Sequence, residues 1–173
     1  MKKDKKIILL SFATEDLKKT INRLKIQAKE SGYYDEINIL SPKNINRNKK
    51  DKIDKLISLG KKRGYAYWYW KPLLILQTLE NINSGDIIHY LDAGFHINKN
   101  RAKKFNEYVD LISNTEKWLL AFQYKTIHAD NMQDIIFPKR EEHMYTKGDI
   151  FNYFKCLDNK EFTHTPQFFA GSF

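Results

Sequence analysis

Cysteine is almost absent from this chain of 173 residues, which contains only Cys156. A single cysteine excludes an internal disulfide framework and a cysteine-based zinc site, and it favours a reducing compartment. Long apolar runs are also absent, since none reaches the ~18 residues of a membrane-spanning helix. The lysine-rich residues 1–6 precede only a short apolar run at 7–10, which is too short for a secretory signal. We therefore expect a cytoplasmic protein.

Several motifs that define enzyme classes are missing as well. The sequence contains no G-x-x-x-x-G-K-[ST] phosphate loop, no G-x-G-x-x-G, no G-x-S-x-G nucleophile elbow and no H-E-x-x-H zinc motif. A nucleotide site, if the chain has one, must therefore be built in another way. His128 and Asp130 lie in a polar, irregular stretch, and the sequence assigns them no role.

Acidic residues are outnumbered by basic ones, 21 to 30, which gives a net charge of +9. Such a charge favours anionic partners: nucleotides, phosphates, nucleic acid or the surface of an anionic membrane. The alternative is a set of lysines on solvated surfaces, because most of them fall in the polar segments 2–6, 49–62 and 99–104. Hydrophobic residues make up 42% of the chain, so a folded core is expected.

Apolar runs and helical stripes alternate along the chain. Apolar runs predict buried strands at 6–12, 36–40, within 85–94 and at 118–122, and helical spacing predicts helices at 15–31, 72–83, 101–114 and 150–157. Strand, helix and strand in this order form a βαβ unit. We expect an α/β fold, with a mostly parallel Rossmann-like sheet flanked by helices, in a single domain spanning 1–173.

The remaining segments are given simpler expectations. Thr14 is placed to cap the first helix, and Cys156 falls within an apolar helical pattern that predicts a core position. Residues 43–52 are predicted to form an exposed loop. Residues 123–143 are predicted to form an irregular loop that is mobile or faces a substrate.

Asp92 follows the apolar run within 85–94 and stands where a strand would end. In open α/β sheets, ligands bind outside the carboxyl ends of the strands, so Asp92 is a candidate metal or ribose ligand. The alternative is a turn or cap residue, with Gly94 letting the backbone turn or a ligand approach. If the strand continues, Tyr90, Asp92, Gly94 and His96 share one face, and His96 becomes a possible second metal ligand.

The most unusual composition lies at 67–70, where four aromatic residues follow one another. In an extended stretch the two tyrosines and the two tryptophans would lie on opposite faces, one for packing and one for stacking on a base or sugar. Lys71 precedes Pro72, which biases it to extended geometry beside a helix start that favours phosphate. Pro72 suits the first turn of that helix, and Arg63 is a second candidate phosphate ligand.

Three blocks of sequence occur in a fixed order: Trp-Tyr-Trp-Lys-Pro at 68–72, Gly-Asp…Tyr-Leu-Asp-Ala-Gly at 85–94, and Gln-Phe-Phe-Ala-Gly at 167–171. Together they resemble a family of bacterial GT-A-type glycosyltransferases of surface-polysaccharide and lipopolysaccharide biosynthesis. The resemblance covers roughly residues 60–173. It implies a nucleotide-sugar-binding domain that transfers a sugar, from a donor we expect to be UDP-linked, to a lipopolysaccharide or capsule acceptor.

The same resemblance makes Asp92 the counterpart of the first acid in the Asp-x-Asp motif of such enzymes, and so the catalytic and metal-binding residue. Gly94 stands where the second acid would be. A Mn²⁺ or Mg²⁺ ion is then held by Asp92, the diphosphate and water, or by a His or Asp from elsewhere, or is absent. The acceptor is expected to be a glycan or a lipid-linked glycan, with peripheral contact to an anionic membrane at its inner face.

The expected donor site gathers residues from the whole chain around the strand ends. Its members are Phe12, Ala13, Thr14, Arg63, Trp70, Lys71, Asp92, Gly94, Gln167, Ala170 and Gly171. The base would lie against the loop 12–14, and Lys71 and Arg63 would offset the charge of the leaving diphosphate. Residues 167–171 would line the region of the transferred sugar.

Two alternatives remain beside this hypothesis. One is a non-enzymatic, basic nucleic-acid-binding domain that stacks bases on its aromatic residues, which the scattered basic residues disfavour. The other is an inactive remnant that still binds nucleotide. The apolar ending at Phe173 leads us to expect a chain truncated from a longer protein, with weak or no transferase activity.

Overall fold

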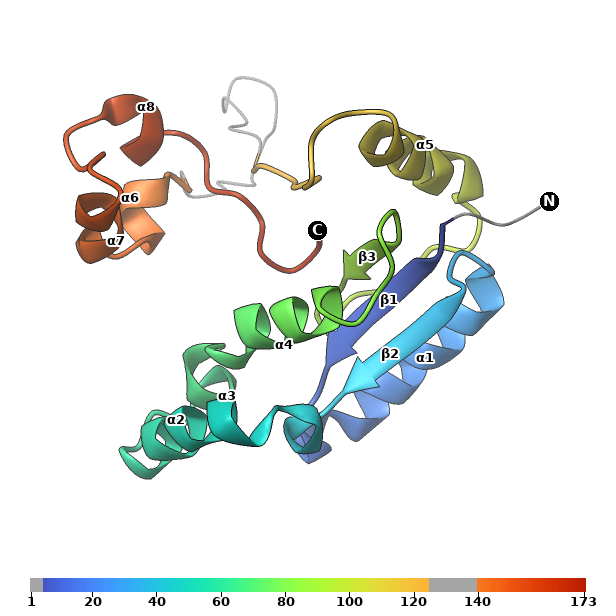
Figure 1. The fold of residues 1–173 in the computed structure, drawn as a ribbon, viewed down its shortest axis with the longest axis horizontal. Helices are drawn as coiled ribbons and strands as arrows, with labels where there is room; N and C mark the ends of the chain where they lie inside the picture. The colour runs from blue at the N-terminus through green and yellow to red at the C-terminus, as the bar shows by residue number, and fades with distance from the viewer. Residues whose placement is uncertain (1–4, 125–139) are drawn as a thin grey trace, which may run out of the picture. The chain divides into compact units, whose positions relative to one another are not determined.

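The computed structural model describes residues 5–124 and 140–173, and the chain divides into two compact units, Met1–Trp118 (unit 1) and Leu119–Phe173 (unit 2). The elements of unit 1 are β1 (Ile7–Phe12), α1 (Lys18–Ser31), β2 (Glu36–Leu40), α2 (Arg47–Ser58), α3 (Gly64–Tyr67), α4 (Trp70–Leu79), β3 (Ile87–Tyr90) and α5 (Ala102–Ser113) (Figure 1). Those of unit 2 are α6 (Glu142–Tyr145), α7 (Gly148–Tyr153) and α8 (Lys160–Thr163).

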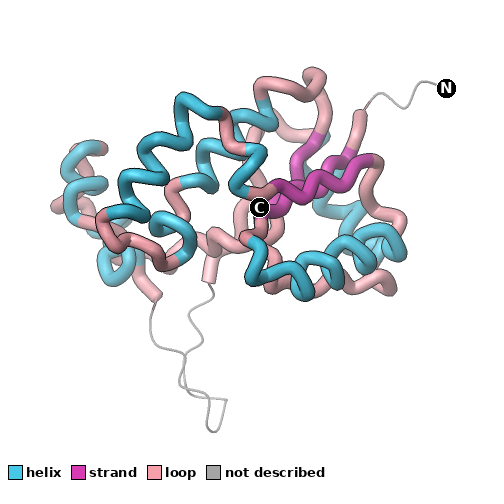
Figure 2. The backbone as a smooth tube through the Cα atoms, turned by 90° about the horizontal axis from the view of Figure 1, so that it is seen from below, coloured by secondary structure: helices cyan, strands magenta, loops and turns pink. Residues whose placement is uncertain are grey.

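Unit 1 is built on a parallel sheet with the strand order β2-β1-β3. The three strands run side by side in Figure 2. Leu9 of β1 pairs in register with Ile37 of β2 and with His89 of β3, while Leu10 pairs with Tyr90. Because β1 has a neighbour on each side, its residues are apolar, as is usual for a buried parallel strand, with the exception of Ser11, which is buried and donates to the carbonyl of Leu91 at 2.6 Å.

Alternate residues of β1 face two different helices. Leu9 packs in a buried cluster with Leu24 and Ala28 of α1, whereas Phe12 on the other face stacks against Trp70 of α4. Side chains in a strand point alternately to opposite faces, so the continuous apolar run at 7–10 supplies both layers. The sheet is therefore covered on both faces, by α1 and by α4 (Figure 1).

The order of the strands creates a reversal at the centre of the sheet. After β1 the chain passes through α1 to β2 on one side, and after β2 it returns past β1 to β3 on the other side. The carboxyl ends of β1 and β3 are therefore the point where successive connections diverge. Ligands of doubly wound α/β folds bind at such a point.

Several sequence predictions are confirmed. The fold is mixed α/β with a parallel sheet flanked by helices, and β2 has the predicted bounds. The first helix ends at Gly32, which has a left-handed φ of 65°, and α5 occupies the helix predicted at 101–114. These elements were predictable because each turns an apolar face, buried in β1 and α1 and half-buried in β2 and α5, away from solvent.

The strand predicted at 118–122 is not formed. Trp118 is 96% exposed and Leu119 is 63% exposed, and a single isolated antiparallel bridge follows at Gln123, with Phe168. An apolar run forms a strand only where a neighbouring strand pairs with its backbone and a core buries its side chains. The predicted loop at 43–52 is also wrong in part, since α2 begins at Arg47.

Two local predictions fail as well. The side chain of Thr14 makes no capping hydrogen bond, because a 3-10 turn at Glu15–Leu17 precedes α1. Cys156 lies beyond α7 instead of within a helix, is half-buried, and donates its backbone amide to the carbonyl of Phe151 at 2.9 Å. Of the loop predicted at 123–143, residues 125–139, with His128 and Asp130, lie outside the described residues.

Candidate functional site

Asp92 lies at the carboxyl end of β3, next to the end of β1. The amide of Leu91 still donates to the carbonyl of Leu10, at 3.0 Å, and the chain then turns, so that the amide of Phe95 donates to the carbonyl of Asp92 at 3.0 Å. The hydrogen bonding to β1 therefore ends at Leu91, just beyond β3, and Asp92 lies in the turn that follows. This is the position at the edge of the sheet that the sequence predicted for it.

One oxygen of the Asp92 carboxylate is held by two donors. The Lys71 ammonium donates to Oδ1 at 2.8 Å, and the Tyr90 hydroxyl donates to the same atom at 2.5 Å. The Lys71 side chain is 13% exposed and that of Asp92 is 39% exposed. Within the described part of the chain, both side-chain contacts of Asp92 go to Oδ1, which leaves Oδ2 able to accept from a ligand.

Tyr90 acts as a fixed donor in this group. Burial of the phenol, together with its hydrogen bond to Asp92, raises the pKa of Tyr90 above its ordinary value. The hydroxyl therefore keeps its proton at neutral pH and donates it to the carboxylate. Lys71 lies over the Tyr90 ring, 4.7 Å from its centroid, so one aromatic residue positions both charged groups.

The aromatic block before Lys71 is not the extended stretch that we predicted: Tyr67 and Trp68 belong to a left-handed turn, and Tyr69 and Trp70 are right-handed helical. Five consecutive residues, 64–68, have φ between 51° and 65°. Four of them carry side chains, for which a left-handed conformation costs roughly 1–2 kcal/mol per residue. Strain of this kind is kept only where the surrounding structure imposes it, and it is often found at functional sites.

The left-handed turn positions the start of α4. Ala66 is completely buried within it, and the indole N–H of Trp70 donates to the carbonyl of Gly64 at 2.9 Å. Trp70 then stacks on Phe12, with ring centroids 3.9 Å apart. With Trp70 fixed against β1, the next residue, Lys71, lies within reach of Asp92. Sequence reasoning missed this turn, because four of its five residues strongly disfavour positive φ.

Lys71 is helical and not extended, which corrects another prediction. The first helical residue is Trp70, so Lys71 and Pro72 both lie in the first turn of α4, and the predicted place of Pro72 is confirmed. The residue before a proline usually avoids helical geometry. Here the amide of Lys71 donates to the carbonyl of Trp68 at 3.0 Å, and its ammonium binds Asp92.

The other predicted nucleotide ligands of unit 1 differ in their access to a ligand. Phe12 and Trp70 are each 5% exposed, and each covers a ring face of the other, so their stacking partner is protein. Ala13 is buried, whereas Thr14 is half-buried. Arg63 is exposed, and its guanidinium lies 5.6 Å from the ring centroid of Trp68. Thr14 is thus the side chain of the loop 12–14 that a ligand can reach.

His96 does not join Asp92. Beyond the turn the chain is no longer a strand, and the two imidazole nitrogens contact Arg23 and Gln27 of α1. The strand period that would have placed Tyr90, Asp92 and His96 on one face ends at Leu91. Gly94 is exposed, and a Cβ added there would meet no atom within 4 Å, so the space beside Asp92 is open.

The block at 167–171 belongs to unit 2. The amide of Gln167 donates to the carbonyl of Arg140 at 2.6 Å, and its carbonyl accepts from the amide of Tyr124 at 3.0 Å. Ala170 is exposed and Gly171 is buried. The segment is thus held by backbone hydrogen bonds on both sides, to the chain before and after 125–139.

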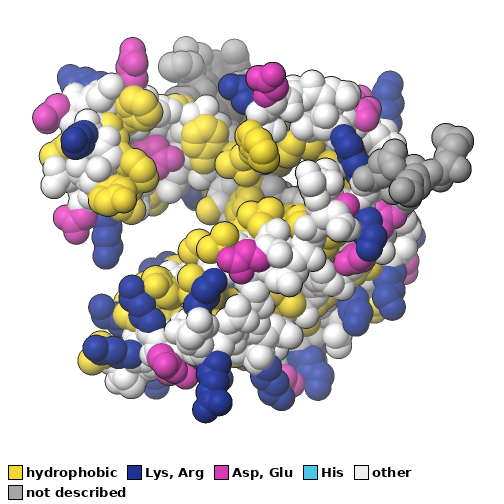
Figure 3. Space-filling model, in the orientation of Figure 1, with side chains coloured by type: hydrophobic (Ala, Val, Ile, Leu, Met, Phe, Trp, Pro, Cys, Tyr) yellow, Lys and Arg dark blue, Asp and Glu magenta, His cyan; other side chains and the backbone are white. Residues whose placement is uncertain are grey.

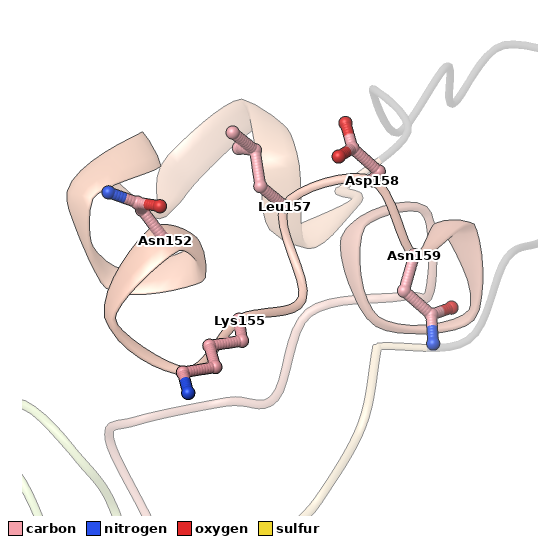
Figure 4. Close-up of a pocket in the computed structure, with 5 residues that line it drawn as sticks. All are labelled: Asn152, Lys155, Leu157, Asp158 and Asn159. Atoms are coloured by element: carbon pink, nitrogen blue, oxygen red, sulfur yellow. The ribbon is translucent and has the colours of Figure 1, made fainter.

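Unit 2 has two further features that the sequence did not predict. Glu141, His143 and His164 each place a metal-ligating atom within 4.8 Å of the others. A pocket of about 440 Å³ lies beside the end of α7 (Figure 4). It is lined by Asn152, Lys155, Leu157, Asp158 and Asn159. None of the predicted site residues lines this pocket, so we give it no part in the site at Asp92.

Comparison with protein-family models, with curated proteins and with solved structures finds no match for this chain. Among the described residues, no helix is both long and apolar enough to span a bilayer. A functional proposal therefore depends on the geometry around Asp92 and on the resemblance of the three sequence blocks.

Proposed function

We propose that the chain is a glycosyltransferase of the GT-A type that binds a nucleoside-diphosphate sugar at the carboxyl ends of β1 and β3. The observation that carries this proposal is the half-exposed Asp92, whose Oδ1 accepts from Lys71 and Tyr90. A carboxylate held on one oxygen and open on the other is prepared for a hydroxyl donor. Its place at the reversal of the strand order is where such folds bind nucleotides.

Within this site, Asp92 accepts a ribose hydroxyl on Oδ2. The ammonium of Lys71, 2.8 Å from Oδ1, favours this role over direct metal binding, because a divalent cation would be repelled at that short range. The half-buried Thr14 marks the side where the base lies. Lys71 and Arg63 offset the charge that develops on the leaving diphosphate, which is where a transferase site gains most.

The proposal does not require a Mn²⁺ or Mg²⁺ ion at this site, but it allows one. Gly94 supplies no carboxylate, so such an ion would take the diphosphate oxygens, water and at most Asp92 as ligands. A Cβ added at Gly94 meets no atom within 4 Å, so Gly94→Asp, which adds the second acid, offers a direct test. We expect this variant to bind UDP more tightly in Mn²⁺ than the wild type does, with no change in the absence of the ion.

The remaining parts of the reaction follow from the resemblance alone. The acceptor that the resemblance implies is a lipopolysaccharide or capsule glycan. The reaction takes place in the cytoplasm, at the inner face of the membrane, where the net charge of +9 attracts anionic lipid.

Calorimetric titration with UDP, with and without Mn²⁺, tests the proposal. We expect Asp92→Asn to weaken UDP binding about tenfold or more, since a hydrogen bond to a charged group contributes about 1.5–3 kcal/mol. The loss should be equal with and without Mn²⁺ if Asp92 binds ribose, and limited to the Mn²⁺-dependent part if it binds metal. Asp110→Asn, an exposed aspartate of α5, is the matched control.

Unchanged UDP affinity in Asp92→Asn would remove Asp92 from the site. Absence of UDP binding by the wild type, together with tight and salt-sensitive binding of a single-stranded oligonucleotide, would favour the nucleic-acid-binding alternative. The same titrations thus separate the two classes of function.

A further inference from the structure

Unit 2 brings together three metal-ligating side chains that are distant in sequence. Glu141 immediately precedes α6, His143 lies on α6, and His164 follows α8. Their ligand atoms lie within 4.8 Å of one another, and the two imidazole rings stack with centroids 4.4 Å apart. Two imidazoles and one carboxylate form a ligand set typical of Zn²⁺, not of Mg²⁺ or Ca²⁺.

A single buried residue, Thr163, orients both imidazoles. Its carbonyl accepts from Nδ1 of His143 at 3.1 Å. Its hydroxyl donates to the carbonyl of Asn159 at 3.1 Å and lies 2.8 Å from Nδ1 of His164. A hydroxyl has one proton to donate, so here it accepts from His164.

Both contacts with Thr163 use Nδ1, which leaves Nε2 of each ring for a metal ion, and Glu141 Oε2 lies 3.5 Å from Nδ1 of His143. A zinc-binding histidine commonly donates its other ring N–H to a backbone carbonyl or a second side chain, and this contact fixes the tautomer. Thr163 is 4% exposed and supplies both acceptors. These contacts hold the two rings beside each other before an ion arrives.

The composition of unit 2 gives such an ion a structural purpose. In its described residues, Phe151 is the only apolar side chain in the buried class. Large apolar side chains over α6–α8 are exposed, as the yellow side chains in Figure 3 show. They include Met144, Tyr145, Ile150, Tyr153, Phe154 and Phe162. Small units with little core are commonly stabilised by disulfides or metals, and one cysteine permits no internal disulfide.

We propose that Glu141, His143 and His164 bind one Zn²⁺ ion that links α6 to the end of α8. Ligands at about 2.0–2.2 Å from a tetrahedral ion lie roughly 3.3 Å apart, so the three side chains must close on the ion from their present spacing. Both histidines are exposed, so small shifts of the rings that keep their Nδ1 contacts with Thr163 close this spacing without disturbing a core. Water occupies the fourth position. All ligands belong to unit 2, so this site does not depend on the function proposed for unit 1.

The test is a titration of the metal-free, full-length chain with Zn²⁺, followed by thermal unfolding with and without the ion. We expect one equivalent to bind and the melting temperature of the wild type to rise, because the ion binds only the folded state. His164→Ala and Glu141→Gln should each weaken binding about tenfold or more and abolish the thermal shift. Circular dichroism without zinc checks that both variants are folded.

Two matched controls locate the site. His96→Ala removes an exposed histidine from unit 1, and Cys156→Ser removes the thiol of unit 2; both should bind Zn²⁺ as the wild type does. Equal zinc affinity in wild type, His164→Ala and Glu141→Gln would overturn the proposal. So would loss of binding in Cys156→Ser, or a wild type that binds no zinc at micromolar concentration.

Discussion

Units 1 and 2 have similar shares of apolar residues, but the two units bury these residues to different extents. In unit 1, Leu9 and Leu24 are completely buried between a parallel sheet and α1. In the described part of unit 2, Phe151 is the sole buried apolar side chain, while Tyr153 and Phe154 beside it are 81% and 69% exposed. Apolar composition alone therefore does not produce a core; a regular element must present that composition on one face.

The largest expected effect comes from a core deletion in unit 1. Leu9→Ala removes a fully buried side chain from the central strand, and we expect it to lower the free energy of unfolding by about 2–5 kcal/mol. Phe154→Ala is the matched deletion in unit 2, and its exposed ring predicts a change within about 0.5 kcal/mol. Urea denaturation followed by circular dichroism measures both. Equal losses of unfolding free energy in the two variants would contradict the difference between the units, because they would mean that Phe154 is buried in solution.

A smaller effect is expected from acid, through one histidine of unit 1. Burial lowers the pKa of His89 from 6.5 to about 4, and its Nδ1 lies 2.9 Å from the Tyr34 hydroxyl. Because the charged form is disfavoured in the folded state, this stability is present above about pH 6.5 and is lost as the pH falls towards 4. Linkage predicts a loss of about 2 kcal/mol between roughly pH 7 and pH 5.

The variant His89→Gln isolates this contribution, since glutamine does not titrate and still offers an acceptor to Tyr34. Unfolding free energies of wild type and variant, measured across the same pH range, should converge as the pH falls. Parallel curves would show that His89 ionises alike in the folded and unfolded chain, and that its burial is not maintained in solution.

The smallest of the three effects concerns two glycines of unit 1. Gly64 has a φ of +56°, and an added Cβ would lie 2.4 Å from the Trp68 ring, whereas a Cβ at Gly94 meets nothing. We expect Gly64→Ala to destabilise unit 1 by about 1–2 kcal/mol, and Gly94→Ala to be neutral or slightly stabilising. Thermal unfolding of both variants measures the difference.

The double variant Gly64→Ala/Trp68→Ala separates the two causes of this loss. If the ring is responsible, removing it restores much of the stability; if the left-handed backbone is responsible, the loss remains. Similar stability of Gly64→Ala and Gly94→Ala would mean that the left-handed turn at 64–68 is not the structure in solution.

Much of the fold of unit 1 and part of its site were predictable. The runs at 7–12 and 36–40 and the helical period of α1 repeat a burial pattern that the chain itself carries, and Asp92 follows from the end of such a run. The left-handed turn at 64–68 was not predictable, because it depends on contacts of Trp70 that override local preference. The strand predicted at 118–122 is the opposite case: its residues favour a strand, but the described part of the chain offers no neighbouring strand to pair with them.

The cluster of Glu141, His143 and His164 could not be predicted from the sequence, because it too depends on contacts between segments that are distant in the chain. Two of its members are close in the chain, but the third is twenty-one positions further on, and no motif spacing connects them. Only the approach of α6 and α8 brings them together. In the same way, Lys71 and Asp92 were each predicted as ligands, but their mutual contact was not.

The ion pair of Lys71 and Asp92 also bears on selectivity. Charge is balanced within the pair before any ligand arrives, so a free inorganic phosphate approaching Asp92 meets a carboxylate and an ammonium that is already engaged. A sugar hydroxyl, in contrast, adds to the carboxylate without separating the two charges. Under the function proposed above, a site arranged in this way would recognise the nucleoside before the phosphates and would discriminate against small inorganic anions.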